Sequence, residues 1–258
     1  MRSSMVLYLS EKYFIDTSFP IDISIPVDFE KNTSAWNLEK ASFNIVKDGS
    51  FIGSVASGGN VNFRDLSFNP HSHCTHTECC GHITKKIHSI NQQQIAFFCK
   101  ALLISATPKK RANTNSTTDD FVIDLDSLKN IEKSINDHDA IIIRSIPNKS
   151  EKLNKNYSGT NPCYLDCDII PFLNKHAIKH LIIDLPSVDK ENDGGELAFH
   201  HKFWNVPSNP NLERTITELA YIPEDIEDGE YVLNLQIAPF ENDASPSRPI
   251  LFKVRRAV

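Results

Sequence analysis

The densest group of potential metal ligands in the chain lies in residues 69–82, NPHSHCTHTECCGH. Four of the ten histidines fall in this stretch, together with one glutamate and three cysteines. Imidazole nitrogen and carboxylate oxygen together suit divalent ions of zinc, manganese or iron. A single histidine is most often structural, but this concentration of histidine and carboxylate side chains predicts a metal site.

The spacing within this stretch indicates which side chains would share the site. In an extended strand, residues i and i+2 point to the same face, and His76 and Glu78 have this relation. His82 follows four residues after Glu78 and could turn back toward it, because Gly81 permits a tight turn. The three cysteines lack the paired two-residue spacing of a structural zinc site, which argues against a cysteine-based centre.

Residues 75–82, THTECCGH, resemble part of a motif of the cyclase-type metal-dependent hydrolases, a family that includes bacterial kynurenine formamidases and isatin hydrolases. The family pattern is T-H-x-D-x-x-x-H, and Glu78 stands where the pattern has aspartate. Four further segments resemble the family, namely residues 21–26, 181–195, 198–204 and 216–251. The resemblance therefore covers most of the chain.

The resemblance implies two metal ions per subunit, with zinc as the first expectation and manganese as the alternative. His71, His76 and Glu78 would hold the first ion, and Glu78, His200 and Glu218 would hold the second. Glu78 would bridge the two ions, and its extra methylene could change the metal preference or the metal separation. Without the resemblance, Glu218 would be interpreted as an exposed carboxylate of a helix or strand.

Two of these assignments are open between neighbouring residues. The first histidine of the family pattern falls on Ser72, which is flanked by His71 and His73. A one-residue bulge in the following segment would bring His71 to the metal face, and His71 is therefore preferred over His73. His201 is the alternative to His200, because a shift by one residue would exchange the two.

The resemblance also implies a hydrolase that cleaves the amide, formamide or lactam C–N bond of a small-molecule substrate by a metal-bound hydroxide. A bound metal ion brings the pKa of water from about 15.7 toward about 7 and polarises the carbonyl group. His82 is the candidate for proton transfer to the leaving amine, because imidazole groups titrate near neutrality, and the alternative is that it is a plain metal ligand. A lactone or other cyclic substrate is one alternative, and a non-catalytic metal-binding protein is the other.

The elements that must position these residues indicate a single α/β domain over residues 1–258 with a mixed sheet. Residues 139–146 form a continuous, largely β-branched run that is typical of a fully buried strand. A helical segment, 167–178, and a further strand, 179–188, follow it, so a parallel crossover unit is expected. The resemblance implies the swivelling β/β/α fold and a homodimer or homotetramer.

Apolar patterning and turn residues predict the other elements. Further strands are expected within residues 20–26, 92–108, 227–240 and 249–254, and two short strands around a glycine turn within residues 51–63. Residues 109–120 have the composition of a loop, and residues 120–135 combine a strand-like start with helical spacing.

Composition argues against several classes of partner and location. The chain has 258 residues, of which 40% are hydrophobic, and a net charge of −6, as in an ordinary globular protein. It has no dense block of lysine and arginine, so no nucleic-acid partner is expected. No apolar run reaches the ~18 residues of a membrane helix, and the short N-terminal run does not resemble a signal peptide. Six cysteines without a paired pattern indicate reduced thiols and a cytoplasmic location.

Overall fold

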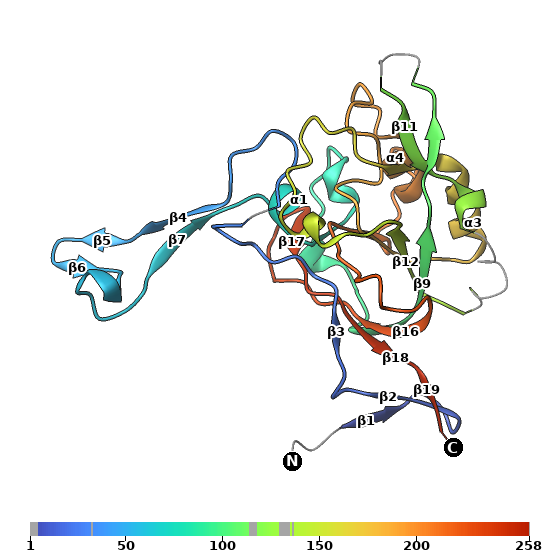
Figure 1. Ribbon diagram of the computed structural model, residues 1–258, viewed down its shortest axis with the longest axis horizontal. Coiled ribbons are helices and arrows are strands. Elements are labelled where there is room, and N and C mark those ends of the chain that lie inside the picture. The colour runs from blue at the N-terminus through green and yellow to red at the C-terminus, as the bar shows by residue number, and fades with distance from the viewer. Residues whose placement is uncertain (1–4, 32, 114–117, 129–134, 136, 258) are drawn as a thin grey trace.

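A nine-stranded mixed sheet forms the centre of the computed structural model, which describes residues 5–31, 33–113, 118–128, 135 and 137–257 (Figure 1). Across the sheet the strands are β17 (Ala244–Pro246), β8 (His76–Glu78), β15 (Thr215–Glu218), β14 (His180–Ile183), β12 (Ala140–Ser145), β9 (Phe98–Ala106), β16 (Gly229–Asn234), β18 (Ile250–Lys253) and β3 (Ile21–Asp22). The four central strands β9, β12, β14 and β15 run parallel, and the strands on either side join them antiparallel. The predicted α/β class with a mixed sheet is confirmed.

The predicted crossover unit forms the middle of this sheet. β12 has the sequence AIIIRS and is buried along its whole length, as a strand covered on both faces must be. The chain then passes through helix α3 (Ile170–Lys175) and returns as β14, which pairs parallel with β12. The helix is shorter than the predicted segment because the 3-10 turn η6 (Cys167–Ile169) occupies its start.

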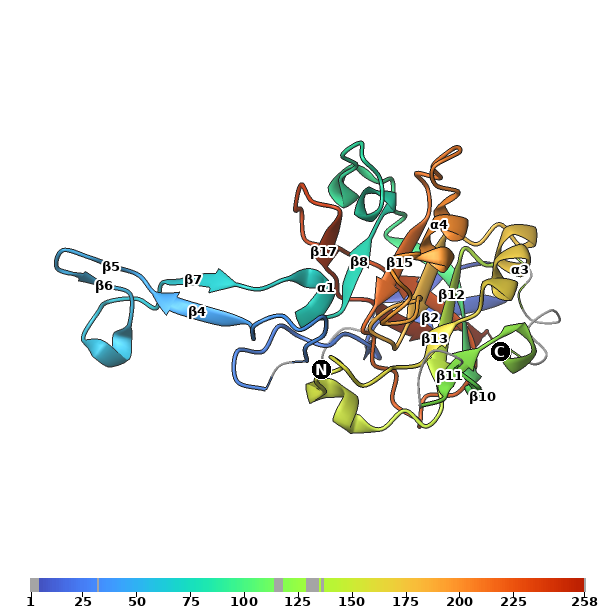
Figure 2. The same cartoon turned by 90° about the horizontal axis from the view of Figure 1, so that it is seen from above.

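Hydrophobic cores lie on both faces of the sheet. On one face, α3 and helix α4 (Ala198–Trp204) lie side by side and pack against the central strands (Figure 2). The largest fully buried side chains on this face are those of Phe199, Phe203 and Trp204. Burial on both faces keeps the strand ends in fixed positions, which a preformed ligand site requires.

Two groups of strands extend away from the main body (Figures 1 and 2). One is the ribbon of β4 (Ser42–Ile45) and β7 (Arg64–Ser67), continued by β5 (Lys47–Asp48) and β6 (Phe51–Ile52). The other is a sheet of β1 (Val6–Tyr8), β2 (Tyr13–Asp16) and β19 (Arg255–Arg256), which brings the two ends of the described chain together.

A further small sheet consists of β10 (Lys109–Arg111), β11 (Asp120–Ile123) and β13 (Tyr164–Leu165). Short helices elsewhere in the described chain are α1 (Pro70–His73) and the 3-10 turns η1 (Val55–Ser57), η2 (Cys80–His82), η3 (Ile90–Gln92), η4 (Leu125–Ser127) and η5 (Ser150–Asn154). None of the helices in the described residues has the length and apolar character that crossing a bilayer requires.

Two sequence-based expectations differ from the structure, and a third falls partly outside the described residues. The start of the predicted loop 109–120 is a strand, β10, because it pairs antiparallel with β11 despite having no apolar alternation. Within residues 51–63 only β6 is a strand, since the chain then turns through η1 and ends that turn at Gly58 with a φ of 90°. The strand-like start expected within 120–135 is β11, which the 3-10 turn η4 follows, and residues 129–134 of the segment with helical spacing lie outside the described residues.

The remaining predicted strands are present, but they begin and end at other residues than predicted. The strands expected within 92–108, 227–240 and 249–254 are confirmed as β9, β16 and β18. The strand expected within 20–26 is reduced to β3, and only an isolated bridge between Ser24 and Ala220 continues it.

Candidate metal centre

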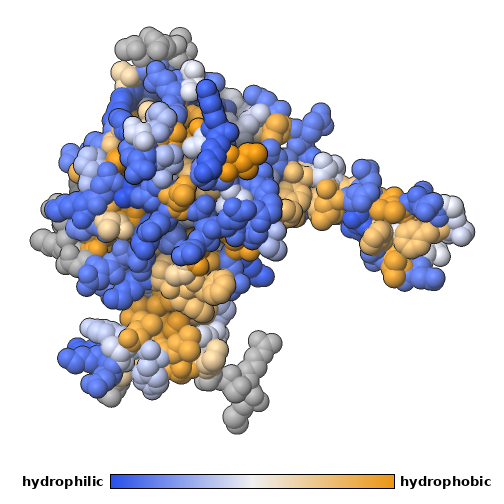
Figure 3. Space-filling model, turned by 180° about the vertical axis from the view of Figure 1, so that it is seen from behind, coloured by the Kyte–Doolittle hydropathy of each residue, from blue (hydrophilic) through white to orange (hydrophobic). Residues whose placement is uncertain are grey.

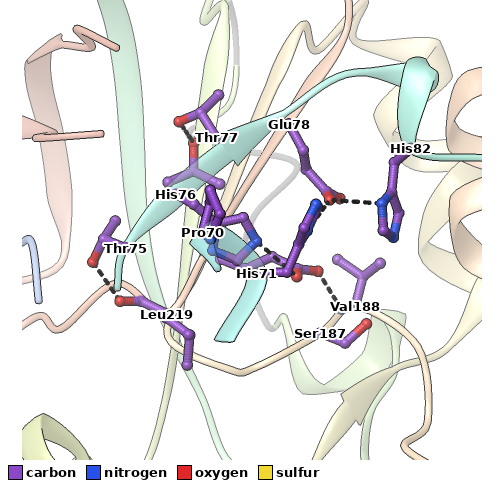
Figure 4. A network of polar contacts seen from close by, with 12 residues as sticks. Pro70, His71, Thr75, His76, Thr77, Glu78, His82, Ser187, Val188 and Leu219 are labelled. Atoms are coloured by element: carbon purple, nitrogen blue, oxygen red, sulfur yellow. Dashed lines mark hydrogen bonds and ion pairs between the residues drawn. The ribbon is translucent and has the colours of Figure 1, made fainter. Parts of the chain in front are cut away.

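β8 carries the two residues that strand spacing places on one face. His76 and Glu78 point into the same buried cluster, whereas Thr77 points to the opposite face, where its hydroxyl oxygen lies 2.8 Å from that of Thr217 (Figure 4). The whole strand is buried because β15 and β17 pair with it on its two sides. The backbone at His76 and Glu78 is therefore held in place by the sheet itself.

Glu218 ends β15 and faces His76 directly, because the two residues are register partners in the antiparallel pair. Its Oε2 lies 3.6 Å from His76 Nε2, and its Oε1 accepts a hydrogen bond of 2.9 Å from the backbone N–H of Val188. Glu218 is only 3% exposed. It is thus a buried member of the cluster and not the exposed carboxylate that the sequence alone would suggest.

A single helical turn, α1, brings His71 into the cluster. The Asn69 side chain accepts a hydrogen bond of 3.0 Å from the backbone N–H of His71, and Pro70 takes the first helical position, so the local sequence favours a helix start. His71 Nδ1 lies 3.1 Å from Glu78 Oε2. The expected bulge is therefore wrong, because the helical turn and not a bulge aims His71 at Glu78.

The neighbouring residues of α1 point elsewhere. The His73 ring accepts a hydrogen bond of 2.9 Å from the backbone N–H of Asn69 and lies 2.9 Å from the carbonyl oxygen of Glu39. The Ser72 hydroxyl donates to the carbonyl oxygen of Ala35 at 2.9 Å. Both side chains are therefore engaged with backbone groups outside the cluster.

Helix α4 contributes His200, and Asp189 orients its ring. His200 Nδ1 lies 2.6 Å from Asp189 Oδ2, and Nε2 lies 3.1 Å from Glu78 Oε1. Asp189 also accepts a hydrogen bond of 3.1 Å from the backbone N–H of His200, which fixes the start of the helix. The ring of His201 turns away from the cluster, toward a backbone carbonyl oxygen 3.2 Å away.

His82 approaches the cluster from η2, and Asp243 lies beside it. His82 Nδ1 is 3.0 Å from Asp243 Oδ2 and 3.9 Å from Glu78 Oε2. His71 Nε2 is 2.9 Å from the same Asp243 oxygen. Gly81 is required in this turn because a Cβ there would lie 2.1 Å from a backbone carbonyl oxygen.

Asp243 is a cluster residue that the sequence did not predict. It lies in the segment 216–251 that resembles the family, but 161 residues separate it from His82 and no ligand spacing connects them. The backbone N–H of Cys79 donates a hydrogen bond of 3.0 Å to the Asp243 carbonyl oxygen, next to the pair of β8 and β17. Only this strand pairing brings Asp243 to the histidines.

The surroundings of Glu78 keep its carboxylate charged. Burial would raise the pKa of Glu78, but the charge of His82, the hydrogen bond from His200 and the close approach of the His71 ring hold it well below its usual range. Glu78 is therefore ionised at neutral pH, as a metal ligand must be.

His71 and His200 hold protons in the metal-free cluster. Burial would lower both pKa values, but the carboxylates of Asp243 and Glu78 raise the pKa of His71 to about 10, and those of Asp189 and Glu78 raise the pKa of His200 to about 10. In the absence of a cation, these protons compensate the negative charge of the buried carboxylates.

Two atoms of the cluster that could bind a metal ion have no hydrogen-bond partner. His76 Nε2 and Glu78 Oε2 are buried without a hydrogen bond, since the 3.1 Å contact of His71 with Glu78 Oε2 lacks hydrogen-bond alignment. Unpaired polar atoms are rare in protein interiors, and a divalent cation would satisfy both. In the described residues, three overlapping triads have ligand atoms within 4.8 Å of one another, namely His71–His76–Glu78, Glu78–His82–His200 and His71–His82–Asp243. The residues therefore fit a divalent ion with mixed nitrogen and oxygen ligands.

A cavity of about 380 Å³ adjoins the cluster. Its lining includes the rings of His71, His82 and His200, and also Lys190 and Trp36. Cavities of roughly 300–1,000 Å³ accommodate small organic ligands. The cluster is thus accessible from a space of the size that a small molecule needs.

Fold and site together define an α/β protein with a buried histidine–carboxylate cluster that fits a divalent metal ion and lies beside a cavity. The family model described as putative cyclase matches residues 21–190, which is more than half of the chain, and the protein belongs to this family. The resemblance seen in the sequence is thereby confirmed.

Individual relatives agree with this assignment. The kynurenine formamidase of Bacillus cytotoxicus is 34% identical over 89 residues, a match that spans 34% of this chain and 39% of that protein. A predicted metal-dependent hydrolase from Bacillus stearothermophilus is 12% identical, with a TM-score of 0.59 over 91% of this chain and 98% of the other. Isatin hydrolase A from Labrenzia aggregata is 12% identical, with a TM-score of 0.62 over 91% and 93% of the two chains. At such low identities the two structural likenesses concern the fold.

The protonated state of the metal-free cluster predicts that metal affinity rises with pH. Metal ions coordinate neutral imidazole, so an ion must displace the protons of His71 and His200 at any pH below about 10. We expect the association constant to increase between about pH 6 and pH 8, by up to about tenfold per pH unit for each proton released. Competition with a chromophoric chelator measures this slope, and calorimetry in buffers of different ionisation enthalpy counts the protons. An affinity that does not change with pH would contradict the protonated cluster.

Proposed function

We propose that this protein is a metal-dependent hydrolase that cleaves an amide, formamide or lactam C–N bond of a small-molecule substrate. The observation that carries the proposal is a buried histidine–carboxylate cluster beside a cavity of about 380 Å³. Two atoms of this cluster that could bind a metal ion have no hydrogen-bond partner. The similar proteins named kynurenine formamidase and isatin hydrolase support this class of reaction.

We assign His71, His76 and Glu78 to a first metal ion, and Glu78, His200 and Glu218 to a second. Glu78 belongs to both sets because its Oε2 faces His71 at 3.1 Å and its Oε1 faces His200 at 3.1 Å. Zinc is proposed for both positions and manganese is the alternative, since both ions accept imidazole and carboxylate ligands. When bound, the ions would supply Lewis acidity to the carbonyl group of the substrate and to a water molecule.

His82 is proposed as the group that passes a proton to the leaving amine. Its Nδ1 faces the Asp243 carboxylate at 3.0 Å, so a hydrogen on Nδ1 leaves Nε2 free to exchange a proton with the substrate. Its side chain is 29% exposed and lines the cavity, whereas the His76 side chain is fully buried. Asp243 would then act as a positioning residue that selects the tautomer of His82.

Two substitutions at Asp243 test this positioning role. We expect Asp243→Ala to lower kcat about 10- to 100-fold with little change in KM, because partners of this kind orient reactive imidazoles without touching the substrate. Asp243→Asn keeps an oxygen that accepts the hydrogen bond, so it should recover part of the loss. Steady-state kinetics of the two variants give this comparison, and equal, unchanged kcat values in both would rule the role out.

The reaction itself is tested by a hydrolysis screen on formyl-arylamines and lactams, with measurement of bound metal. We expect turnover of at least one of these substrates, its loss on treatment with a chelator, and its recovery on addition of Zn²⁺ or Mn²⁺. A set of lactones in the same screen examines the alternative substrate class. Tight metal binding without turnover of any amide, lactam or ester would favour the non-catalytic alternative.

We also propose that residues 1–258 form one domain that acts in the cytoplasm as a homodimer or homotetramer. The main sheet includes β3 near the start of the chain and β18 near its end, which supports a single folding unit. All six cysteines are free, which agrees with a reducing compartment.

A further inference from the structure

The ribbon that projects from the body is well ordered within itself. We call residues 42–67 the arm, and Figure 2 shows it extending far from the main sheet. Beyond β4 and β7 the two chain segments stay joined, because the backbone N–H of Val46 donates to Phe63 at 3.1 Å and that of Gly53 donates to Val46 at 2.9 Å. A Cβ on Gly53 would lie 2.4 Å from the Phe63 carbonyl oxygen, so this close approach requires glycine. The arm is therefore a hydrogen-bonded β-ribbon and not an irregular loop.

One face of β4 and β7 is mainly apolar and the other is polar. In the register of the two strands, Phe43 pairs with Leu66, and Ile45 lies on the same face with its partner Arg64, whose guanidinium lies 4.1 Å from the centroid of the Phe43 ring. The opposite face carries the polar side chains of Ser42, Asn44, Asp65 and Ser67. Alternation of this kind is typical of an antiparallel ribbon whose apolar face packs on a core.

In the described part of the chain, Phe29 packs edge-on against Phe43 with 5.6 Å between the ring centroids, but most of this apolar face remains uncovered. Every residue of β4 and β7 is exposed, with exposed fractions of 37% for Phe43, 36% for Ile45 and 55% for Leu66. Toward the tip the large apolar side chains are exposed as well, and Figure 3 shows them gathered on the arm. These residues are Phe51, Val55, Val61 and Phe63. An isolated two-stranded ribbon is at best marginally stable in water, so a structured arm with an open apolar face needs a covering surface.

The charge of the arm favours an identical copy as the partner. Lys47 and Arg64 balance Asp48 and Asp65, so the arm is neutral while the whole chain carries −6. All of the net charge therefore lies outside the arm. Two arms can approach each other without net repulsion, whereas the neutral arm offers no long-range attraction to a strongly charged partner.

We propose that the arm is the surface by which two copies of this chain associate. This inference rests on the homo-oligomer proposed above and assigns its interface. Half-exposed apolar side chains on each arm present on the order of 500 Å². The arms of two copies therefore supply about 1,000 Å², the lower end of what a specific interface needs. In a two-fold dimer the same patch occurs on both subunits, so the apolar face of each arm covers that of the other.

Two matched double variants, one on each face of the arm, test this proposal. Ile45→Glu/Leu66→Glu places charges on the apolar face, and Asn44→Glu/Ser67→Glu places the same number of negative charges on the polar face of the same strands. Because all four positions are exposed, both variants should keep the circular dichroism and melting temperature of the natural protein. Light scattering after gel filtration gives the mass of each. This measurement depends on neither metal nor substrate, so its result is separate from that of the hydrolysis screen.

We expect the apolar-face variant to be a monomer at concentrations where the natural protein and the polar-face variant are dimers or tetramers. The dissociation constant should rise about 100-fold or more, since buried apolar anchors carry most of the energy of an interface. A natural protein that is itself monomeric would overturn the proposal. So would an apolar-face variant that keeps the natural mass, or equal dissociation of the two variants.

Discussion

Replacement of His200 by alanine is expected to remove about one equivalent of bound metal and to lower kcat/KM about 1,000-fold or more. The ring lies between Glu78 and Asp189, at 3.1 Å and 2.6 Å, and nothing else on α4 faces Glu78. Loss of the imidazole therefore removes a ligand of the proposed second ion and leaves two buried carboxylates without their common partner. Elemental analysis of the purified variant and kinetics on a substrate identified in the screen measure the two effects.

His201→Ala is the matched control, because it removes the same side chain from the next position of the same helix. His201 faces a backbone carbonyl away from the cluster, so this variant should keep both metal content and kcat/KM. His200→Gln preserves a polar group between the two carboxylates and separates loss of a ligand from loss of folding. Full metal content in a folded His200→Gln variant, or equal losses in the two alanine variants, would contradict the assignment of His200.

Replacement of His82 by alanine is expected to lower kcat about 100- to 1,000-fold while metal content stays close to that of the natural protein. His82 Nδ1 faces Asp243 at 3.0 Å and is 3.9 Å from Glu78 Oε2, so its nearest carboxylate is the proposed positioning residue. A proton donor that is lost in this way can be replaced from solution, and added imidazole should restore part of kcat. The measurement combines elemental analysis with kinetics across a series of imidazole concentrations.

The control for this variant is His88→Ala, which removes a nearby imidazole that does not belong to the cluster. It should leave kcat unchanged. If His82→Ala retains full turnover, His82 has no part in the mechanism. If it loses a full equivalent of metal and imidazole does not restore kcat, His82 is a metal ligand and not the proton donor.

The sheet explains why the centre of the cluster is firmly positioned and its rim is less so. His76, Glu78 and Glu218 lie on strands that are paired and buried, and their register sets which side chains face one another. His71 and His82 come from single turns and line the cavity. The carboxylates of Glu78 and Glu218 are therefore anchored in the sheet, and the group proposed to exchange a proton has access to the cavity.

The sequence by itself determined the features that depend on local periodicity. His76 and Glu78 had to share a face because side chains alternate along any strand, wherever that strand lies in the fold. The run AIIIRS had to be a covered strand, and the helix and strand that follow it had to form a parallel crossover. These conclusions need only neighbours in the chain, and the structure confirms them.

Only the tertiary structure decided which residues far apart in the chain meet. Asp243 reaches His82 through the pairing of β17 with β8, and no spacing in the sequence records that contact. The choice of His200 over His201 depends on how Asp189 caps α4, and the position of His71 depends on a helical turn where a strand bulge was expected. Each of these contacts depends on long-range packing, which local propensity does not encode.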